Sequence, residues 1–252
     1  MGNPKDGQIY RVPSVGAPVL FGTTPQNPSQ TFFDPGSTFG GDMLVTTAFG
    51  KVYKFTSSGM STLLANVGED TEGMAIAGSA FGPYAGDLLV SSEISGAIRA
   101  ISPQGVITRL RTSASHFVSI PGAETVNVVP ASLGSGNPVE GFYVVNSPRD
   151  ILKAAASEFL SLKGDAIVTS EAAGSPIWDL KYDSRTGFFD ASQVGALPNH
   201  PEDSIFVTAP KLVNSELVAP EPSTWAMMLI GFAGLGFAGY RASRKSAAAV
   251  VG

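Results

Sequence analysis

The chain has 252 residues, no cysteine, two histidines and a formal net charge of −5 at pH 7. It therefore cannot form disulfide bonds, thiolate metal sites or a zinc site built of several histidines, and its acidic balance argues against nucleic acid as a partner. Roughly 210 residues precede an apolar C-terminal segment, enough for one large all-β domain or two small ones.

Several segments of the chain repeat one pattern. The three clearest copies open at Gly41, Gly86 and Gly164. Each copy has a Gly-Asp turn, an apolar run, a hairpin that contains glycine, an alternating strand, a polar turn and a last strand. A more divergent copy opens at Gly141, residues 7–23 match only the second half of the pattern, and residues 203–209 match only its opening strand.

An additional strand precedes two of these units. Glu72 begins the strand that leads to Gly86, and Glu124 begins one that we expect to lead to the unit at Gly141. Each unit then contains four antiparallel strands in meander order over about 40 to 50 residues, which is typical of a β-propeller blade. A β-sandwich also has short strands and frequent turns, but it does not predict Gly-Asp openings in register with a hairpin. The sequence therefore favours an all-β fold, a β-propeller of four-stranded blades.

The half-units at the two ends leave two blade numbers open. If residues 7–23 join residues 203–209 in one blade, the ring has five blades; if an upstream segment is missing, it has six. We favour the second, in which the domain is N-terminally truncated. The repeats resemble NHL-type and gluconolactonase-like propellers, and they lack the Trp-Asp dipeptide of WD40 repeats.

The resemblance to gluconolactonase-like propellers implies a divalent cation, such as calcium, in a central channel. Oxygen ligands from inner strands would hold it, and Glu72 and Glu124 begin two such strands. Further oxygen ligands could come from Asn127, Asn146, Asp150 and Asp179. Acidic residues beside glycine turns are more often solvated, or hydrogen-bonded to loop amides, than metal ligands, so we expect no cofactor, with a divalent cation held by Glu72 and Glu124 as the alternative.

Other candidates for chemistry are weaker. Glu93 and Glu171 occupy matching positions in two units, but the remaining units lack a carboxylate there, so we attribute the match to shared ancestry of the blades. His116 and His200 lie in polar segments that we expect to be loops, and no Gly-x-Ser-x-Gly elbow is present. The sequence predicts no catalytic residue and favours a binding or structural module over an enzyme.

The C-terminal segment has the features of a membrane span. From Pro222 to Tyr240 the chain carries no charge, and a helix of this length reaches ~28 Å, close to the thickness of the hydrocarbon core. Aromatic and basic residues flank it: Trp225, Tyr240, Arg241, Arg244 and Lys245. Because the basic residues lie on one side only, we expect the C-terminus in the cytoplasm and residues 1–219 outside.

The triplet Pro220, Glu221 and Pro222, followed by this apolar run and the basic cluster, closely resembles the PEP-CTERM sorting signal of exopolysaccharide-producing Gram-negative bacteria. The resemblance implies that an exosortase, a membrane cysteine protease, recognises the triplet and cuts near it. We expect a propeller-like domain at residues 1–210, a linker at 211–219, and a sorting tail at 220–252 with a transmembrane helix at 223–240.

These features together predict an exported protein that is anchored in the inner membrane and, after processing, lies at the cell surface or in the extracellular matrix. Its expected partners are the exosortase, the membrane and exopolysaccharide or other matrix components. A metal-dependent, lactonase-like hydrolase using Glu72 and Glu124 is the alternative. If the tail is not cut, the chain is a single-pass membrane protein in which Gly234 and Ala238 could face a neighbouring helix.

Export requires a secretion signal. Residues 1–20 contain no apolar stretch of about 7 to 15 residues behind a basic start. We therefore expect the true precursor to begin upstream of Met1.

Overall fold

Short antiparallel strands make up the part of the chain that the structure describes. The computed structural model describes residues 7–34, 36–148 and 150–209, all within one compact unit. The strands form five sheets. These are β1 (Gln8–Arg11) with β2 (Val19–Thr23); β3 (Pro28–Phe33), β4 (Met43–Thr47), β5 (Lys51–Phe55) and β6 (Ser61–Asn66); β7 (Met74–Ile76), β8 (Leu88–Ser91), β9 (Ile98–Ile101) and β10 (Ile107–Arg109); β11 (Ala123–Val128), β14 (Ala166–Ser170), β15 (Pro176–Asp183) and β16 (Phe188–Ala196); and β17 (His200–Val207), β12 (Gly141–Ser147) and β13 (Asp150–Ala155).

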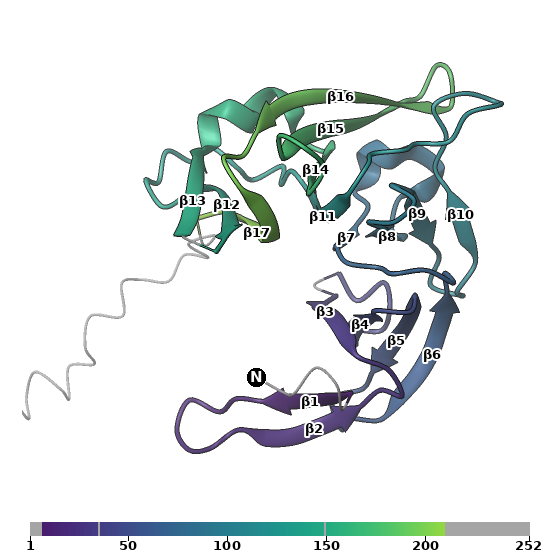
Figure 1. Ribbon diagram of the computed structural model, residues 1–252, viewed down its shortest axis with the longest axis vertical. Coiled ribbons are helices and arrows are strands. Elements are labelled where there is room, and N and C mark those ends of the chain that lie inside the picture. The colour runs from purple at the N-terminus through teal and green to yellow at the C-terminus, as the bar shows by residue number, and fades with distance from the viewer. Residues whose placement is uncertain (1–6, 35, 149, 210–252) are drawn as a thin grey trace, which may run out of the picture. The chain divides into compact units, whose positions relative to one another are not determined.

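Four of these sheets follow one another as the blades of a propeller (Figure 1). Each has an inner strand, namely β3, β7, β11 or β17. The inner strands contact one another in sequence, β3 with β7, β7 with β11, and β11 with β17. The first three blades have four strands and the fourth has three. This arrangement confirms the all-β propeller that the repeats predict.

Glycine turns introduce the second strand of each of the first three blades. Gly41, Gly86 and Gly164 have φ angles of +73°, +88° and +91°, in the left-handed region that glycine adopts without a Cβ clash. The strands that follow them, β4, β8 and β14, are buried at every position, because adjacent blades cover both of their faces. The repeated Gly-Asp pairs are therefore turns, as predicted.

The third blade departs from the predicted strand order. β11, which contains Glu124, pairs with β14 and not with β12, so the prediction that this strand leads to the unit at Gly141 is wrong. The turn hydrogen bonds show the true equivalence: Gly164 N donates to Val129 O at 3.0 Å, as Gly86 N donates to Ala77 O at 2.9 Å. Residues 129–165 leave the blade, build β12 and β13, and return.

The fourth blade is completed from the end of the described chain. β17 pairs antiparallel with β12, with Ser204 opposite Val144. Among the described strands, β1 pairs with β2 alone. The joining of residues 7–23 with residues 203–209 in one blade, on which five-bladed closure depended, is therefore wrong. Side-chain packing holds β17 on β12 instead, because the tilted rings of Phe206 and Phe142 lie 4.7 Å apart between centroids.

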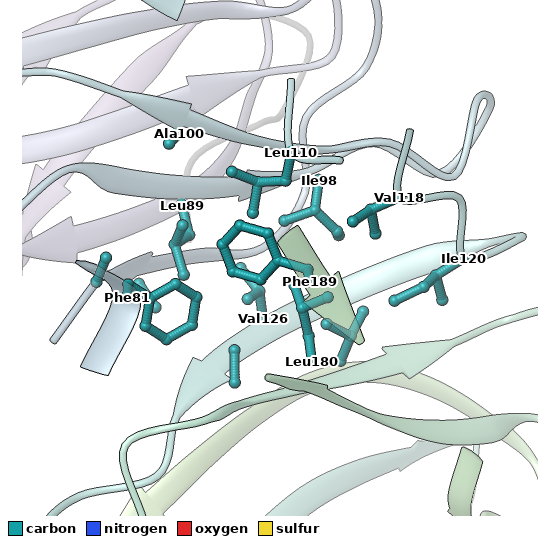
Figure 2. Packing of buried hydrophobic residues seen from close by; sticks show 14 of the residues in the cluster. Phe81, Leu89, Ile98, Ala100, Leu110, Val118, Ile120, Val126, Leu180 and Phe189 are labelled. Atoms are coloured by element: carbon teal, nitrogen blue, oxygen red, sulfur yellow. The ribbon is translucent and has the colours of Figure 1, made fainter. Parts of the chain in front are cut away.

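The largest hydrophobic cluster joins the second and third blades (Figure 2). Phe81, from the 3-10 segment η2 (Ser79–Tyr84), and Leu89 of β8 pack with Val126 of β11 and Phe189 of β16. The rings of Phe81 and Phe189 lie 5.7 Å apart between centroids. A second 3-10 segment, η3 (Ala156–Leu162), follows β13. Burial between blades thus fixes where the inner strands lie.

Within the described ranges, no helix has the length and apolar character needed to cross a membrane. The predicted linker at residues 211–219 and the predicted transmembrane helix at 223–240 lie outside those ranges.

Candidate functional site

Carboxylates gather beside the inner strands of the second and third blades. Glu93, Glu124 and Glu171 each bring a carboxylate oxygen within 4.8 Å of the other two. Glu124 lies on β11, whereas Glu93 and Glu171 follow the second strands β8 and β14. Glu72 precedes β7 and lines a cavity of about 180 Å³ together with Glu124. We call Glu72, Glu93, Glu124 and Glu171 the acidic cluster.

Backbone packing, and not charge, brings these residues together. Ser91 Oγ accepts a hydrogen bond from Gly73 N at 2.8 Å and donates one to Glu124 O at 2.6 Å, which ties β8 to β11. A Cβ at Gly73 would lie 2.3 Å from Val126 N, so only glycine permits this approach. Glu171 N donates to Gly122 O at 2.8 Å. The carboxylates converge because adjacent blades meet here.

Hydroxyl and amide groups hold the fourth blade against the third. Thr125 Oγ1 lies 2.8 Å from Thr169 Oγ1 and also contacts Ser204 of β17. Asn127 Nδ2 donates to Ser204 Oγ at 2.7 Å. These contacts place Glu202 at the cavity beside the acidic cluster. The inner strand of the fourth blade therefore adds further negative charge to the site.

Burial and mutual repulsion favour the protonated form of two members of the cluster. Burial raises the pKa of Glu124 to about 9, and the charges of Glu72, Glu171 and Glu93 contribute. Burial, together with a hydrogen bond to Asp70 and the charge of Asp70, raises the pKa of Glu72 to about 8. Among the described residues, no lysine or arginine forms an ion pair with any of the four.

The geometry suits an oxygen-liganded cation. Glu124 is 8% exposed, and within the described ranges no group hydrogen-bonds to its carboxylate. A hard divalent ion such as Ca²⁺ prefers carboxylate oxygens, and its charge would favour ionised glutamates. The structure places Glu72 and Glu124, which the sequence singled out, at one cavity. It adds Glu93 and Glu171, whose matching repeat positions were the overlooked signal.

The other four ligand candidates lie apart from this cluster or are engaged elsewhere. Asn146 Nδ2 donates to Asp150 Oδ1 at 2.7 Å near the β12–β13 turn. Asn127 is hydrogen-bonded to β17. Asp179 lies on β15, where burial and the charge of Asp165 raise its pKa to about 6. The sequence suggested these residues as further oxygen ligands but carried no information on their local partners.

The two histidines do not form a catalytic arrangement with the described residues. His116 lies in an exposed loop, where its Nδ1 is 2.9 Å from Ser113 Oγ and 3.0 Å from Ser115 Oγ. His200 begins β17, so the expectation that it lies in a loop is wrong. Burial, together with the charges of Glu93 and Glu202, raises the pKa of Glu171, and the nearby His200 acts in the opposite direction.

Comparisons with known proteins match the tail and the fold separately. Residues 218–245 match the model of the PEP-CTERM protein-sorting motif. No curated protein is similar to the chain in sequence.

Similar solved structures include an auxiliary nutrient binding protein from Bacteroides ovatus (14% identity, TM-score 0.45, 76% of this chain and 39% of that chain). A candidate 6-phosphogluconolactonase from Bacteroides uniformis (13%, 0.47, 82% and 53%) and streptogramin B lyase (13%, 0.41, 79% and 65%) are also similar. The chain spans less than two thirds of each of these proteins.

Proposed function

Because the chain carries a PEP-CTERM protein-sorting motif at residues 218–245, we propose that it is exported and sorted by an exosortase. In this proposal residues 223–240 form the membrane helix, Pro220, Glu221 and Pro222 are the recognised triplet, and the linker at 211–219 connects them to the propeller. The uncharged run up to Tyr240 and the basic residues after it support this assignment.

The propeller serves, in this proposal, as a binding or structural module displayed at the cell surface or in the extracellular matrix. Two observations support a module over an enzyme. Neither histidine is paired with both a nucleophile and a carboxylate within the described ranges. The loops and strand edges of the blades leave polar and aromatic side chains on the surface, where a matrix polymer could reach them.

Replacing Pro220, Glu221 and Pro222 with alanine is expected to leave most of the chain, with an intact C-terminus, in the membrane fraction. The physical reason is that the protease would lose its recognition element while the apolar span remains. Immunoblotting and terminal-peptide mass spectrometry of membrane, periplasmic and extracellular fractions measure the outcome. Glu216→Ala, which removes the same charge outside the motif, is the control. Unaltered release of the triplet variant would contradict the proposal.

A second candidate function follows from the acidic cluster. Three carboxylates within 4.8 Å of one another, with Glu124 buried and its carboxylate unpaired among the described residues, support a divalent cation site. A cation held there would act as a Lewis acid toward a bound carbonyl group. The corresponding activity is a metal-dependent, lactonase-like hydrolysis, in which Glu72 and Glu124 would help to hold the ion.

Calcium titration of the metal-free protein tests this candidate. We expect wild-type protein to bind Ca²⁺, and Glu124→Gln to weaken the affinity by at least about tenfold, because a charged ligand is replaced by a neutral amide. Asp190→Asn, at an exposed position on β16, is the charge-matched control and should bind as wild type. No heat of binding in wild type, or equal binding in Glu124→Gln, would refute the site. If the protein binds Ca²⁺ but hydrolyses no member of a panel of lactones, the hydrolase candidate is refuted and the cation site stands.

A further inference from the structure

Three arginines project from one face at the outer edge of the second blade. Arg109 of β10 lies directly opposite Arg99 of β9, and Arg111 forms an isolated bridge with Phe117. Side chains two residues apart on a strand share a face, so Arg109 and Arg111 point the same way as Phe117. Leu110, between the two arginines, points into the hydrophobic core (Figure 2).

The ring of Phe117 is shared by two guanidinium groups. The Cζ atom of Arg111 lies 4.2 Å from the ring centroid, and the Cζ atom of Arg109 lies 4.7 Å from it. Both distances are within the range of a cation–π interaction. Phe117 is nevertheless 39% exposed. The ring therefore holds the half-buried guanidinium of Arg109 beside the exposed Arg111.

Only Arg99 in this group has a carboxylate partner among the described residues. Arg99 forms an ion pair with Glu69, and Ser95 Oγ donates to the same Glu69 oxygen at 2.8 Å. Although burial acts to raise it, these hydrogen bonds and the charges of Arg99 and Arg109 hold the pKa of Glu69 below its usual value. Arg109 and Arg111 form no ion pair within the described ranges. A chain of net charge −5 thus carries a local excess of positive charge here.

Most of the N–H donors of these two arginines have no partner. Arg111 Nη1 donates to Ala114 O at 2.7 Å. Arg109 makes no side-chain hydrogen bond to any described residue, and its Nε is buried without a partner. A guanidinium presents five N–H donors in a planar fork that matches a carboxylate in bidentate geometry. Outward-facing donors of this kind suit a carboxylate-bearing ligand.

We propose that Arg109, Arg111 and Phe117, the arginine patch, bind an acidic polysaccharide whose sugars carry carboxylates. The guanidinium groups would donate hydrogen bonds to the carboxylates, and the exposed edge of the Phe117 ring would contact the apolar face of a sugar. The adjoining exposed loop offers the hydroxyl of Ser115 and the imidazole of His116 for sugar hydroxyls. Duplex nucleic acid or an anionic membrane would need a much wider basic surface than two arginines on an acidic chain. The patch is separate from the acidic cluster and needs no metal.

The test is a titration of the full chain, purified in detergent, with a polyuronate oligosaccharide at low ionic strength. We expect Arg109→Ala and Arg111→Ala each to weaken binding by about ten- to hundredfold, the range for lost hydrogen bonds to a charged group. Arg111→Lys keeps the charge but loses the fork, so it should fall between wild type and Arg111→Ala. Arg185→Ala removes an arginine that is 90% exposed at another turn and should leave the affinity unchanged.

Four results would overturn the proposal: no binding by wild type, equal binding of neutral dextran, wild-type affinity in the Arg109→Ala/Arg111→Ala double variant, or tighter binding to polyphosphate or anionic vesicles than to polyuronate. Thermal unfolding of each variant checks that it is folded. If an alanine variant is not, Arg111→Lys and Arg109→Gln carry the test, because both retain long side chains over Phe117. Sorting plays no part in this experiment, so its outcome is independent of the sorting motif.

Discussion

Without divalent ions, the protein is expected to lose stability as the pH rises from about 5 to about 9. In the folded state the pKa of Glu72 is raised to about 8 and that of Glu124 to about 9, from an ordinary value of 4.5. Between these values the unfolded chain has released protons that the folded protein still holds. The free energy of unfolding therefore falls with rising pH across this range.

Thermal unfolding in a chelating buffer across this pH range measures the effect. Glu124→Gln replaces the carboxylic acid with a neutral amide of similar shape, so its melting temperature should exceed that of wild type at high pH and depend less on pH. Asp190→Asn should retain the wild-type slope. Added Ca²⁺ should stabilise wild type most at high pH, where the glutamates of the cluster are ionised and repel one another unless a cation is bound. A slope of opposite sign, or one unchanged in Glu124→Gln, would show that the cluster does not control this behaviour.

The blades could be predicted from sequence because their determinants are local. The Gly-Asp turns require positive φ at Gly41, Gly86 and Gly164, and apolar runs follow each of them. A turn and the strand after it lie within a few residues of each other, so their pattern survives in the sequence. This is why the fold class, the turns and most second strands agree with the structure.

Strand partners could not be predicted in the same way. β11 and β14 are separated by a long excursion, and their pairing depends on Val126 reaching the shared core. β17 is likewise placed by the packing of Phe206 on Phe142 and by the contact of Ser204 with Thr125. These are contacts between residues far apart in the chain, and one sequence carries no sign of them.

Only two of the four residues of the acidic cluster could be predicted as ligands, because the cluster also depends on contacts between distant parts of the chain. Glu72 and Glu124 could be predicted because Glu72 directly precedes an inner strand and Glu124 lies on one. The inner strands of adjacent blades contact one another. Glu93 follows β8 and reaches Glu124 because β8 contacts β11, whereas Glu171 follows β14, which pairs with β11 in the same blade. The repeat showed that their positions are equivalent, but it contained no information on distance.

Phe142→Ala is expected to destabilise the protein by about 3–5 kcal/mol, the usual cost of removing a buried phenylalanine side chain. Phe142 is 1% exposed and packs against Phe206 of β17 at 4.7 Å and against Phe159 of η3 at 5.5 Å between ring centroids. The fourth blade has three strands, so few other contacts can compensate. The loss should loosen β17, which joins this blade to β11.

Urea unfolding measures this cost, with Phe33→Ala as the matched control. Phe33 on β3 is 71% exposed, and the same truncation there should change stability by no more than about 0.5 kcal/mol. Equal losses in the two variants would contradict the packing described for Phe142. A separate early transition in Phe142→Ala would mean that the fourth blade unfolds alone. A single transition would mean that the contacts of Thr125 and Asn127 with Ser204 couple it to the third blade.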